Sequence, residues 1–471
     1  MTPTPFALIL AILGVVLLFR ASLTAMFSLY LVATLFGGSA AILLGSLGGS
    51  SIPPAQFALI FVALRCVLPG QGQMATLREA VWHNRFLVLF VLYGVISAFT
   101  LPILFANMMD VTPLKSLPRF DLFAVQPLAM TSQNVTTAVY LTGTMFAGIS
   151  ACAAMSRPGA AERVVRLGAA IAITHALLGI SSVVLAGTAW DDFLQIFRNG
   201  NYAQLDQSFG DLARMNGIWP EPSGYAAYGG VWCVFMIELW FRNVLPKLTG
   251  PAGLLLLFAL IGSTSSTAYV SLGAYAVLIS VRFAIAPWNL PARKQLAILA
   301  VALFAAVAIL TLFVIFPDFV RQFGNILALM TIEKGDSASG LQRAFWAKQG
   351  IDAFVDSYGL GIGAGSFRSS SLLTAILGSM GVIGAVCFLA HVVRALQPFN
   401  AEFVAMRLPT MERAVGCAAA TTALVMLAPQ SVASPSPDPG TLWAVMCGIA
   451  IALRLNKAPR PRPVARPAFA Q

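Results

Sequence analysis

Long apolar runs recur from one end of the chain to the other, and they limit its possible folds more than any other feature. The runs are about 13 to 25 residues long, and a helix needs about 20 apolar residues to cross the hydrocarbon core of a bilayer. In lipid, a helix satisfies its backbone hydrogen bonds internally. The sequence therefore predicts an all-α polytopic membrane protein.

The composition excludes the main alternative classes. Hydrophobic residues make up 58% of the chain and charged residues only 10%, whereas soluble proteins carry roughly 25% charged residues. So low a charged fraction cannot cover a water-facing surface. The same balance argues against intrinsic disorder and against nucleic-acid binding, although the net charge is +11.

Hydropathy predicts about 12 to 13 membrane-spanning helices. They form one integral membrane domain over residues 1–455, followed by a basic, proline-rich tail at 456–471 that we expect to be disordered and cytoplasmic. The predicted spans are 5–19, 23–47, 54–68, 86–106, 135–154, 167–187, 223–241, 251–263, 267–286, 296–316, 372–393, 414–430 and 441–454.

The charges of the loops differ strongly between the two sides of the membrane. One side receives 20 basic and four acidic residues, and the other receives nine basic and 13 acidic residues. Because cytoplasmic loops are enriched in Lys and Arg, the first side is predicted to be cytoplasmic. The protein is then expected to lie in a bacterial inner membrane with its C-terminus in the cytoplasm. The periplasmic face then carries three long loops, at 107–134, 188–222 and 317–371, and loops of this length are usually functional or disordered.

The second long loop ends in a charged segment that leads into a predicted span. Arg214 and Glu221 lie seven residues apart, and a proline on each side of Glu221 stiffens its backbone. Ser223 and Gly224 can form the N-cap region of the next helix, whose free N–H groups suit an anion. A capped helix start with an interfacial ion pair is the simpler interpretation. Capping alone, however, does not require an arginine, a proline-flanked acid and a helix N-terminus together on one loop end.

The third long loop contains an amphipathic segment at 341–358. It predicts a short interfacial helix on the membrane surface, with Arg343 on its flank. Its apolar stripe at helical spacing consists of Leu341, Ala344, Ala347, Ile351, Phe354 and Tyr358.

A glycine-rich stretch follows this segment and precedes the next span. Gly361, Gly363 and Gly365 alternate with other residues, and Ser366 and Arg368 add a hydroxyl and a charge. Glycines let a backbone approach a ligand and turn its N–H groups toward it, so these residues are candidates for substrate binding. A flexible loop or a close helix crossing explains the same glycines.

Metal chemistry is poorly supported by the sequence. All six cysteines fall within predicted spans without CxxC spacing, and the chain has three histidines. We therefore expect no metal site and no cofactor. Polar groups within the predicted spans are few, chiefly His175 and Glu238, whereas a proton-coupled transporter normally carries several buried carboxylates.

The two loop segments, on this topology, resemble the O-antigen polymerase/ligase superfamily. The first match is Arg214 followed by Glu221-Pro-Ser at the start of a span, and the second is Arg343 followed by the stretch from Gly361 to Phe367. A serine-containing break between two spans, at 263–266, also fits. The resemblance implies a glycosyltransferase that moves glycans from undecaprenyl pyrophosphate on the periplasmic face, in O-antigen or exopolysaccharide biosynthesis, by a metal-independent inverting transfer.

The resemblance also implies roles for individual residues. Arg214, Glu221 and Arg343 are the expected catalytic residues, since arginines hold phosphate oxygens and a carboxylate deprotonates the acceptor hydroxyl. The expected substrate-binding residues are Arg368, Ser223, Gly361, Gly363, Gly365 and Ser366. The partners are the membrane, the lipid-linked glycan, and a chain-length regulator and flippase of the same pathway.

Two other functions remain open from the sequence. Ligases of this superfamily typically have a histidine in the late periplasmic loop, and residues 317–371 contain none, which favours a polymerase acting on repeat units. A flippase or exporter of lipid-linked oligosaccharides would have short loops and charges lining a cavity within the spans. This chain instead has charges in its long outer loops and almost none within the bilayer.

Overall fold

The computed structural model describes residues 2–44, 50–68, 73–115, 123–200, 208–209, 212–286, 291–300, 303, 307, 338–397, 401–406 and 408–455. Several predictions from the sequence fall partly or wholly outside this set. They are the tail at 456–471, most of the span at 296–316, and parts of the three long loops, including 317–337.

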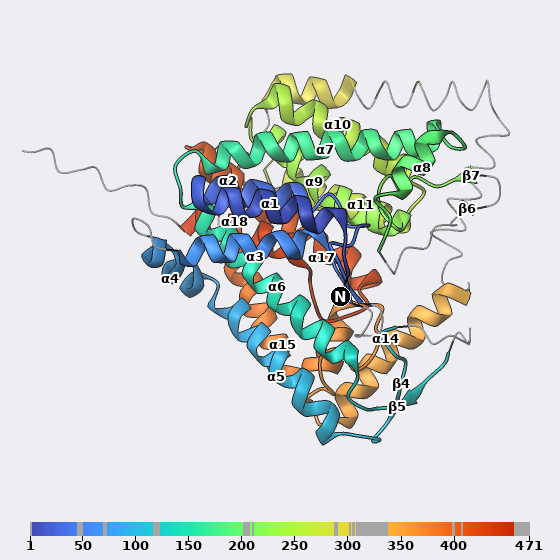
Figure 1. Ribbon diagram of the computed structural model, residues 1–471. Helices are drawn as coiled ribbons and strands as arrows, with labels where there is room; N and C mark the ends of the chain where they lie inside the picture. Colours follow the sequence, from blue (N-terminus) through green and yellow to red (C-terminus); the bar gives the residue numbers. More distant parts are fainter. Residues whose placement is uncertain are drawn as a thin grey trace, which may run out of the picture.

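The described chain is almost entirely helical, as the sequence predicts (Figure 1). The helices are α1 Pro5–Arg20, α2 Leu23–Ala33, α3 Pro54–Val67, α4 Gln73–His83, α5 Arg85–Leu104, α6 Ser132–Met155, α7 Ala160–Val184, α8 Ala189–Gln195, α9 Pro222–Phe241, α10 Pro246–Gly262, α11 Ser266–Ile285, α14 Ala338–Asp356, α15 Leu372–Leu396, α16 Ala401–Val404, α17 Met411–Ala433 and α18 Thr441–Leu455. Residues 292–300 are also helical.

Strands are short and confined to connections. The antiparallel strands β1 Thr2–Pro3, β2 Ile42–Leu44 and β3 Ser50–Ile52 form one sheet in that order. Two further antiparallel pairs join β4 Asp110–Val111 to β5 Gln126–Pro127, and β6 Ser208–Phe209 to β7 Leu212–Ala213.

Within the described residues, six helices are long and apolar enough to cross a membrane: α5, α6, α7, α11, α15 and α17. Five more apolar helices are shorter, namely α1, α2, α3, α10 and α18. The chain is thus a multi-pass membrane protein by the length and composition of its helices.

One predicted span is much shorter in the structure. The sequence predicts a helix over 23–47, but α2 ends at Ala33. Beyond it, the Ala41 N–H donates to Ile52 O at 2.8 Å and the Thr4 N–H donates to Ala41 O at 2.9 Å. The apolar residues 42–44 therefore pair as strand β2, which hydropathy alone does not distinguish from a helix.

The helical bundle has two ends, which are defined here by contacts between residues of different helices and loops. At one end Arg394 contacts His83 at 3.2 Å and Arg454 donates to Ala395 O at 3.4 Å. At the other end Arg214 donates to Thr264 O, and the N–H of Ser369 donates to Pro435 O at 3.0 Å. We call these the basic end and the loop end. In Figure 1, α4 lies at the basic end on the left, and α8, α14 and β4 to β7 lie at the loop end on the right.

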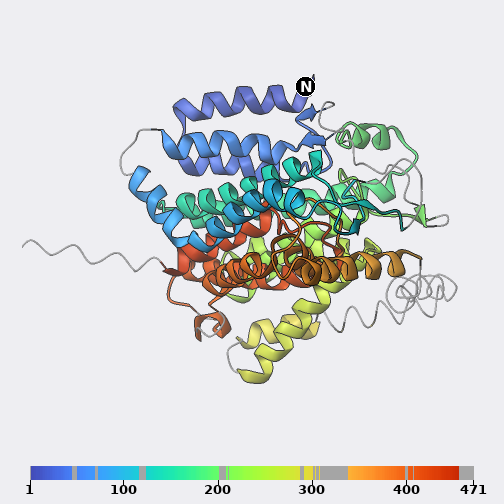
Figure 2. The same cartoon turned by 90° about the horizontal axis from the view of Figure 1, so that it is seen from below.

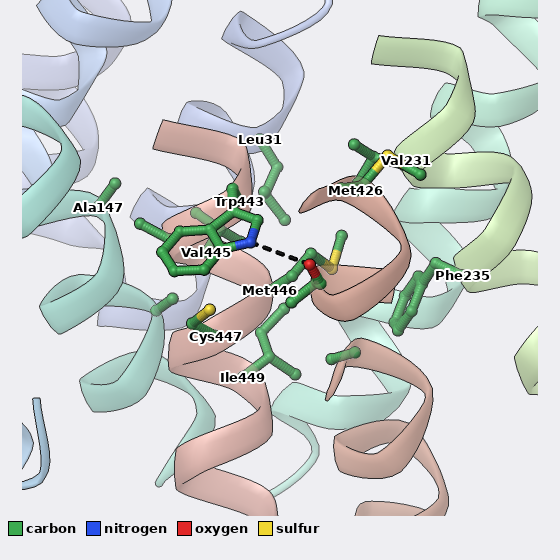
Figure 3. Packing of buried hydrophobic residues seen from close by; sticks show 14 of the residues in the cluster. Leu31, Ala147, Val231, Phe235, Met426, Trp443, Val445, Met446, Cys447 and Ile449 are labelled. Carbon is green, nitrogen blue, oxygen red and sulfur yellow. Dashed lines mark hydrogen bonds between the residues drawn. The ribbon is translucent and has the colours of Figure 1, made fainter. Parts of the chain in front are cut away.

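The core is packed through small residues that let helices approach closely. Helix α18 lies against α6 and α17, and a Cβ on Gly448 would lie 2.3 Å from the carbonyl oxygen of Gly148. The buried Trp443 fills the space at this junction, and its Nε1 donates to Ala423 O of α17 at 3.0 Å (Figure 3). Close approach of backbones is how helices associate in a membrane, where lipid is as apolar as the side chains.

A buried ion cluster joins three helices near the basic end. The Glu238 carboxylate of α9 accepts from Arg282 of α11 at 2.7 Å, from Arg242 at 3.3 Å and from Tyr275 at 2.9 Å. The side chains of Glu238 and Arg242 are 0% exposed and that of Arg282 is 3% exposed. Arg282 also donates to Thr421 of α17 at 2.9 Å. The one intramembrane carboxylate that the sequence indicates is therefore held in place by arginines.

Replacing Glu238 should destabilise the bundle strongly. The substitution Glu238→Ala removes the carboxylate that lies between two buried guanidinium groups, and breaking a buried pair costs about 3–5 kcal/mol. The control Glu162→Ala removes an ion pair with Arg166 whose side chains are 48% and 61% exposed, and such a pair contributes about 0.3–0.5 kcal/mol. The unfolding temperature in detergent should fall sharply for the first variant and stay near wild type for the second. Equal unfolding temperatures would contradict the role of the cluster.

Candidate functional site

Hydrogen bonds to Arg198 and Ser182 hold the centre of the loop that carries Arg214 and Glu221. Arg198 donates from Nε to Gly217 O at 2.9 Å and from Nη2 to Asn216 Oδ1 at 3.0 Å. The Gly217 N–H donates to Ser182 Oγ of α7 at 3.2 Å. Gly217 has φ +53 and lies against the backbone of α7, so a side chain there would be strained and crowded. The loop therefore has a fixed path before it reaches Glu221.

The next part of this loop, Ile218 and Trp219, packs directly against two consecutive glycines. A Cβ on Gly37 would lie 2.1 Å from the Trp219 ring, and a Cβ on Gly38 would lie 2.3 Å from Ile218 O. These glycines follow α2, so the early interruption of the predicted span 23–47 makes room for the loop before α9. Trp219 also packs on Gly224, 3.2 Å from where its Cβ would be.

Glu221 is the N-cap residue of α9. Its φ and ψ are −142 and 149, and Pro222 is the first residue of the helix. The sequence predicts the N-cap region at Ser223 and Gly224, and in the structure the N-cap residue is Glu221 instead. Ser223 donates from its Oγ to Glu221 Oε2 at 3.0 Å and so helps to orient the carboxylate.

Arg214 reaches across to the break between α10 and α11. Its Nη2 donates to Thr264 O at 3.1 Å, and Thr264 has φ +49 in the interruption that the sequence predicts at 263–266. Burial lowers the pKa of the Arg214 guanidinium, and the negative charge of Glu221 opposes this shift. A guanidinium remains charged in a protein even so, and the Arg214 Nε is buried with no hydrogen-bond partner among the described residues.

Arg343 lies on α14, which forms the helix that the sequence predicts at 341–358. The helix crosses α15 closely, since a Cβ on Gly378 would lie 2.6 Å from Gly350 O. Gln349, only 6% exposed, accepts from the Thr112 N–H at 2.8 Å and donates to Asp110 O at 3.2 Å. Small and polar residues thus anchor α14 to the protein.

The predicted apolar stripe of α14 faces outward. Leu341 is 54% exposed, Ile351 is 50% exposed and Tyr358, just beyond the helix, is 90% exposed. Lys348 pairs with Asp352 at 2.8 Å on the exposed surface. The stripe therefore lies on the surface of the protein and does not pack into its core.

The glycine-rich stretch packs against helices. Gly361, Gly363 and Gly365 have φ +83, +101 and +88. Added Cβ atoms would lie 2.5 Å from Ser379 C, 2.6 Å from Pro102 Cδ and 2.5 Å from Gln133 O, respectively. The alternating glycines let the chain pass between α15, α5 and α6, which is the close-crossing alternative.

Hydrogen bonds of the same stretch also stay within the protein. The Gly361 N–H donates to Ser357 Oγ at 2.8 Å, and the Gly363 N–H donates to Ser379 O at 2.9 Å. Ser366 is buried, donates to Ile362 O at 2.9 Å and accepts from Asn134 Nδ2 at 2.9 Å. These N–H and hydroxyl groups have hydrogen-bond partners within the protein, and their bonds fix the backbone that leads to Arg368.

Arg368 emerges from this stretch in a fixed position. Its N–H donates to Thr112 O at 2.9 Å and its Nη1 donates to Leu114 O at 3.2 Å. The guanidinium lies over the Trp346 ring of α14, 4.5 Å from the centroid, a favourable cation–π contact. Ser370 Oγ donates to Arg343 O at 2.6 Å, which ties the same segment to α14.

At the loop end the four predicted charged residues form a series of electrostatic neighbours, from Arg214 through Glu221 and Arg368 to Arg343. Burial lowers the pKa of Arg368, the charge of Glu221 opposes this shift, and the neighbouring Arg343 adds to it. Glu221 thus lies within electrostatic range of both Arg214 and Arg368, although the two loops are far apart in the sequence. Within the described residues, Arg214, Arg343 and Arg368 form no direct ion pair with a carboxylate. This excess of positive charge suits a polyanionic ligand.

A cavity of about 350 Å³ is lined in part by Trp219 and Gly224, which lie on either side of Glu221 in the sequence. It is bounded by the start of α9, the end of α17 and the start of α18. Asp438, in the connection 434–440, also lines it and was not singled out from the sequence. The available signal was its pair of flanking prolines, which repeats the arrangement around Glu221.

Comparisons of the chain with protein-family models, with characterised proteins and with solved structures find no match. In the part of the chain that the structure describes, no three His, Cys, Asp or Glu residues gather closely enough to hold a metal ion. The chemistry of the site is therefore inferred from its own residues.

The packing role of the glycine-rich stretch can be tested with one pair of alanine variants. Gly361 and Gly159 both have positive φ, at +83 and +72, but only at Gly361 would the new Cβ clash with backbone atoms. Both variants incur the left-handed penalty of roughly 1–2 kcal/mol. Gly361→Ala should lower the unfolding temperature well beyond Gly159→Ala, measured on purified protein in detergent. Similar losses in both would show that space is not limiting at Gly361.

Proposed function

We propose that this chain is a membrane glycosyltransferase that polymerises polyprenyl-diphosphate-linked oligosaccharide repeat units. The observation that carries the proposal is the meeting of Arg214, Glu221, Arg343 and Arg368 at one end of a membrane bundle. The resemblance of the two loops to the O-antigen polymerase/ligase superfamily supports it. The loop end would face the periplasm and the basic end the cytoplasm, in accordance with the distribution of Lys and Arg.

The arginines would bind the diphosphate of the donor. Arg343 and Arg368 are close enough for their charges to repel each other, and a bound anion relieves that repulsion. Guanidinium groups hold phosphate oxygens with paired N–H donors and keep their charge under all physiological conditions. During transfer the leaving diphosphate gains one negative charge, so the same contacts become stronger in the transition state.

Glu221 would act as the general base. The acceptor hydroxyl gives its proton to the Glu221 carboxylate while its oxygen attacks the anomeric carbon of the donor sugar. The bond between that carbon and the diphosphate oxygen breaks, and its electron pair leaves with the polyprenyl diphosphate. A single displacement of this kind inverts the anomeric centre. The hydrogen bond from Ser223 Oγ would hold the carboxylate in position to accept the proton.

The exposed apolar stripe of α14 supports a substrate that arrives in the membrane. The stripe would rest at the outer leaflet, with Arg343 on the same helix near the level of lipid headgroups. A diphosphate carried on a polyprenyl chain lies at this boundary. The proposal therefore accounts for an apolar face and a basic cluster on neighbouring surfaces.

Substitutions at the charged residues should stop chain extension without unfolding the protein. In a deletion strain, Glu221→Gln should reduce extension about 10²–10⁴-fold because the general base is lost. Arg343→Ala should reduce it about 10²–10³-fold because the leaving diphosphate loses a contact. The measurement is the length distribution of extracted glycans by gel electrophoresis and mass spectrometry, with protein amount checked by size-exclusion chromatography.

Matched controls and the accumulating species identify the activity. Lys348→Ala and Asp356→Asn change exposed charges of α14 and should leave chain length unchanged. Single repeat units left on lipid in the deletion strain indicate a polymerase. Full-length chains not attached to lipid A would indicate a ligase, and repeat units held on the cytoplasmic leaflet would indicate a flippase. Normal polymer from both Glu221→Gln and Arg343→Ala would overturn the proposal.

The proposed orientation is testable with reporter fusions. Alkaline phosphatase is active only after export, and green fluorescent protein fluoresces only in the cytoplasm. Fusion of the phosphatase after Gly200, in the loop at 188–222, should give an active reporter, and fusion of the fluorescent protein to the C-terminus should give a bright one. The reverse pattern would place the site on the cytoplasmic side and contradict the proposed topology.

A further inference from the structure

The cavity beside Glu221 has a lining that is distinct from the arginine cluster. Its volume of about 350 Å³ lies at the small end of the range of roughly 300–1,000 Å³ for ligand pockets. Much of its wall is apolar, from residues such as Met426, Pro429 and Leu442. Its lining, as described, contains no Lys or Arg, and Asp438 is its one charged residue. Such a wall disfavours a diphosphate and suits a neutral or cationic ligand.

Two other lining residues carry buried polar atoms that lack a hydrogen-bond partner among the described residues. They are Nε1 of Trp219, which can only donate, and Oε1 of Gln430, which can only accept. Gln430 is held in place because its Nε2 donates to Pro439 O at 2.9 Å. Buried polar groups are almost always hydrogen-bonded in native proteins. A ligand that both donates and accepts would satisfy both atoms.

Asp438 adds a carboxylate oriented by the protein. Its Oδ1 accepts from Thr144 Oγ1 at 2.7 Å and from the Gly440 N–H at 3.0 Å. Within the described residues it forms no ion pair, and neither of these hydrogen bonds uses Oδ2. Asp438 can therefore accept a further hydrogen bond. Together with the Gln430 amide oxygen and the Trp219 indole N–H, it gives the otherwise apolar wall a small number of polar groups.

We propose that this cavity is the acceptor-sugar subsite, in which Asp438 and Gln430 accept hydrogen bonds from sugar hydroxyls and Trp219 provides a donor and a ring surface. The inference rests on the proposed function and specifies its acceptor. A sugar has apolar C–H faces and many hydroxyls that donate and accept, which matches this lining. Trp219 and Gly224 flank Glu221 in the sequence and line the cavity, so a sugar held here lies next to the general base, while the arginines lie outside it.

The test separates acceptor binding from donor binding. Full-length protein is purified into nanodiscs, with lipid-linked repeat unit extracted from the deletion strain as donor. The acceptor is a fluorescent, short-chain-lipid version of the same repeat unit, and each substrate is varied while the other is held constant. Asp438→Asn should raise the KM for the acceptor about tenfold or more, because a hydrogen bond to a charged group is lost. The KM for the donor should stay within about twofold of wild type.

A second variant and a control guard against a folding defect. Gln430→Glu keeps an accepting oxygen and loses the Nε2 donor to Pro439 O, whereas Gln430→Met loses both groups. A rise in the KM for the acceptor in Gln430→Met but not in Gln430→Glu therefore assigns the effect to the accepting oxygen. Asp356→Asn makes the same chemical change on the exposed surface of α14 and should change neither KM. The unfolding temperature of each variant is measured in the same nanodiscs, and only variants within a few degrees of wild type are compared.

The outcomes distinguish the subsite from the proposed function. If Glu221→Gln abolishes transfer while Asp438→Asn and Gln430→Met behave as wild type, the subsite is refuted and the function stands. If Asp438→Asn raises the KM for the donor instead, the cavity does not hold the acceptor. If wild-type protein transfers no sugar from the lipid-linked donor, the proposed function fails, and the inference fails with it.

Discussion

Among the described residues of the loop end, two partly buried arginines interact with the same carboxylate, that of Glu221. Arg214 and Arg368 are partly buried, which disfavours a charged group, and each has Glu221 within electrostatic range. Within the part of the chain that the structure describes, one carboxylate does not neutralise three guanidinium groups, and the backbone carbonyls of Thr264 and Leu114 supply part of the stabilisation of Arg214 and Arg368.

The two ends of the bundle use arginine differently. At the basic end, Glu238 forms ion pairs with both Arg242 and Arg282, and all three side chains are buried. That cluster joins α9, α11 and α17 and has a structural explanation that needs no ligand. At the loop end, the described arginines contact backbone carbonyls and an aromatic ring rather than a carboxylate. The arginines of the two ends are thus stabilised by different partners within one chain (Figure 2 gives the second view of the bundle).

The sequence predicts the helical class, the location of most helices and the charged residues of the site, because each depends on local patterns. The break at 263–266 and the helix at 341–358 are both present in the structure. The role of Gly361 was not predictable, since alternating glycines serve ligand approach and helix crossing equally well. Asp438 was missed because a proline-flanked acid in a short connection resembles an ordinary turn. The pairing of Glu238 with Arg282 joins separate helices, which periodicity within one segment does not reveal.

The glycine-rich stretch that threads between α5, α6 and α15 has an evolutionary consequence. Every change within it would disturb the bundle and the placement of Arg368 together, so this stretch has little freedom to diversify. The connection 434–440 is constrained as well, because Gly440 has φ +86 and Asp438 accepts hydrogen bonds from Thr144 Oγ1 and the Gly440 N–H. Both segments therefore leave little room for substitution, and variation that the fold tolerates is expected in other connections.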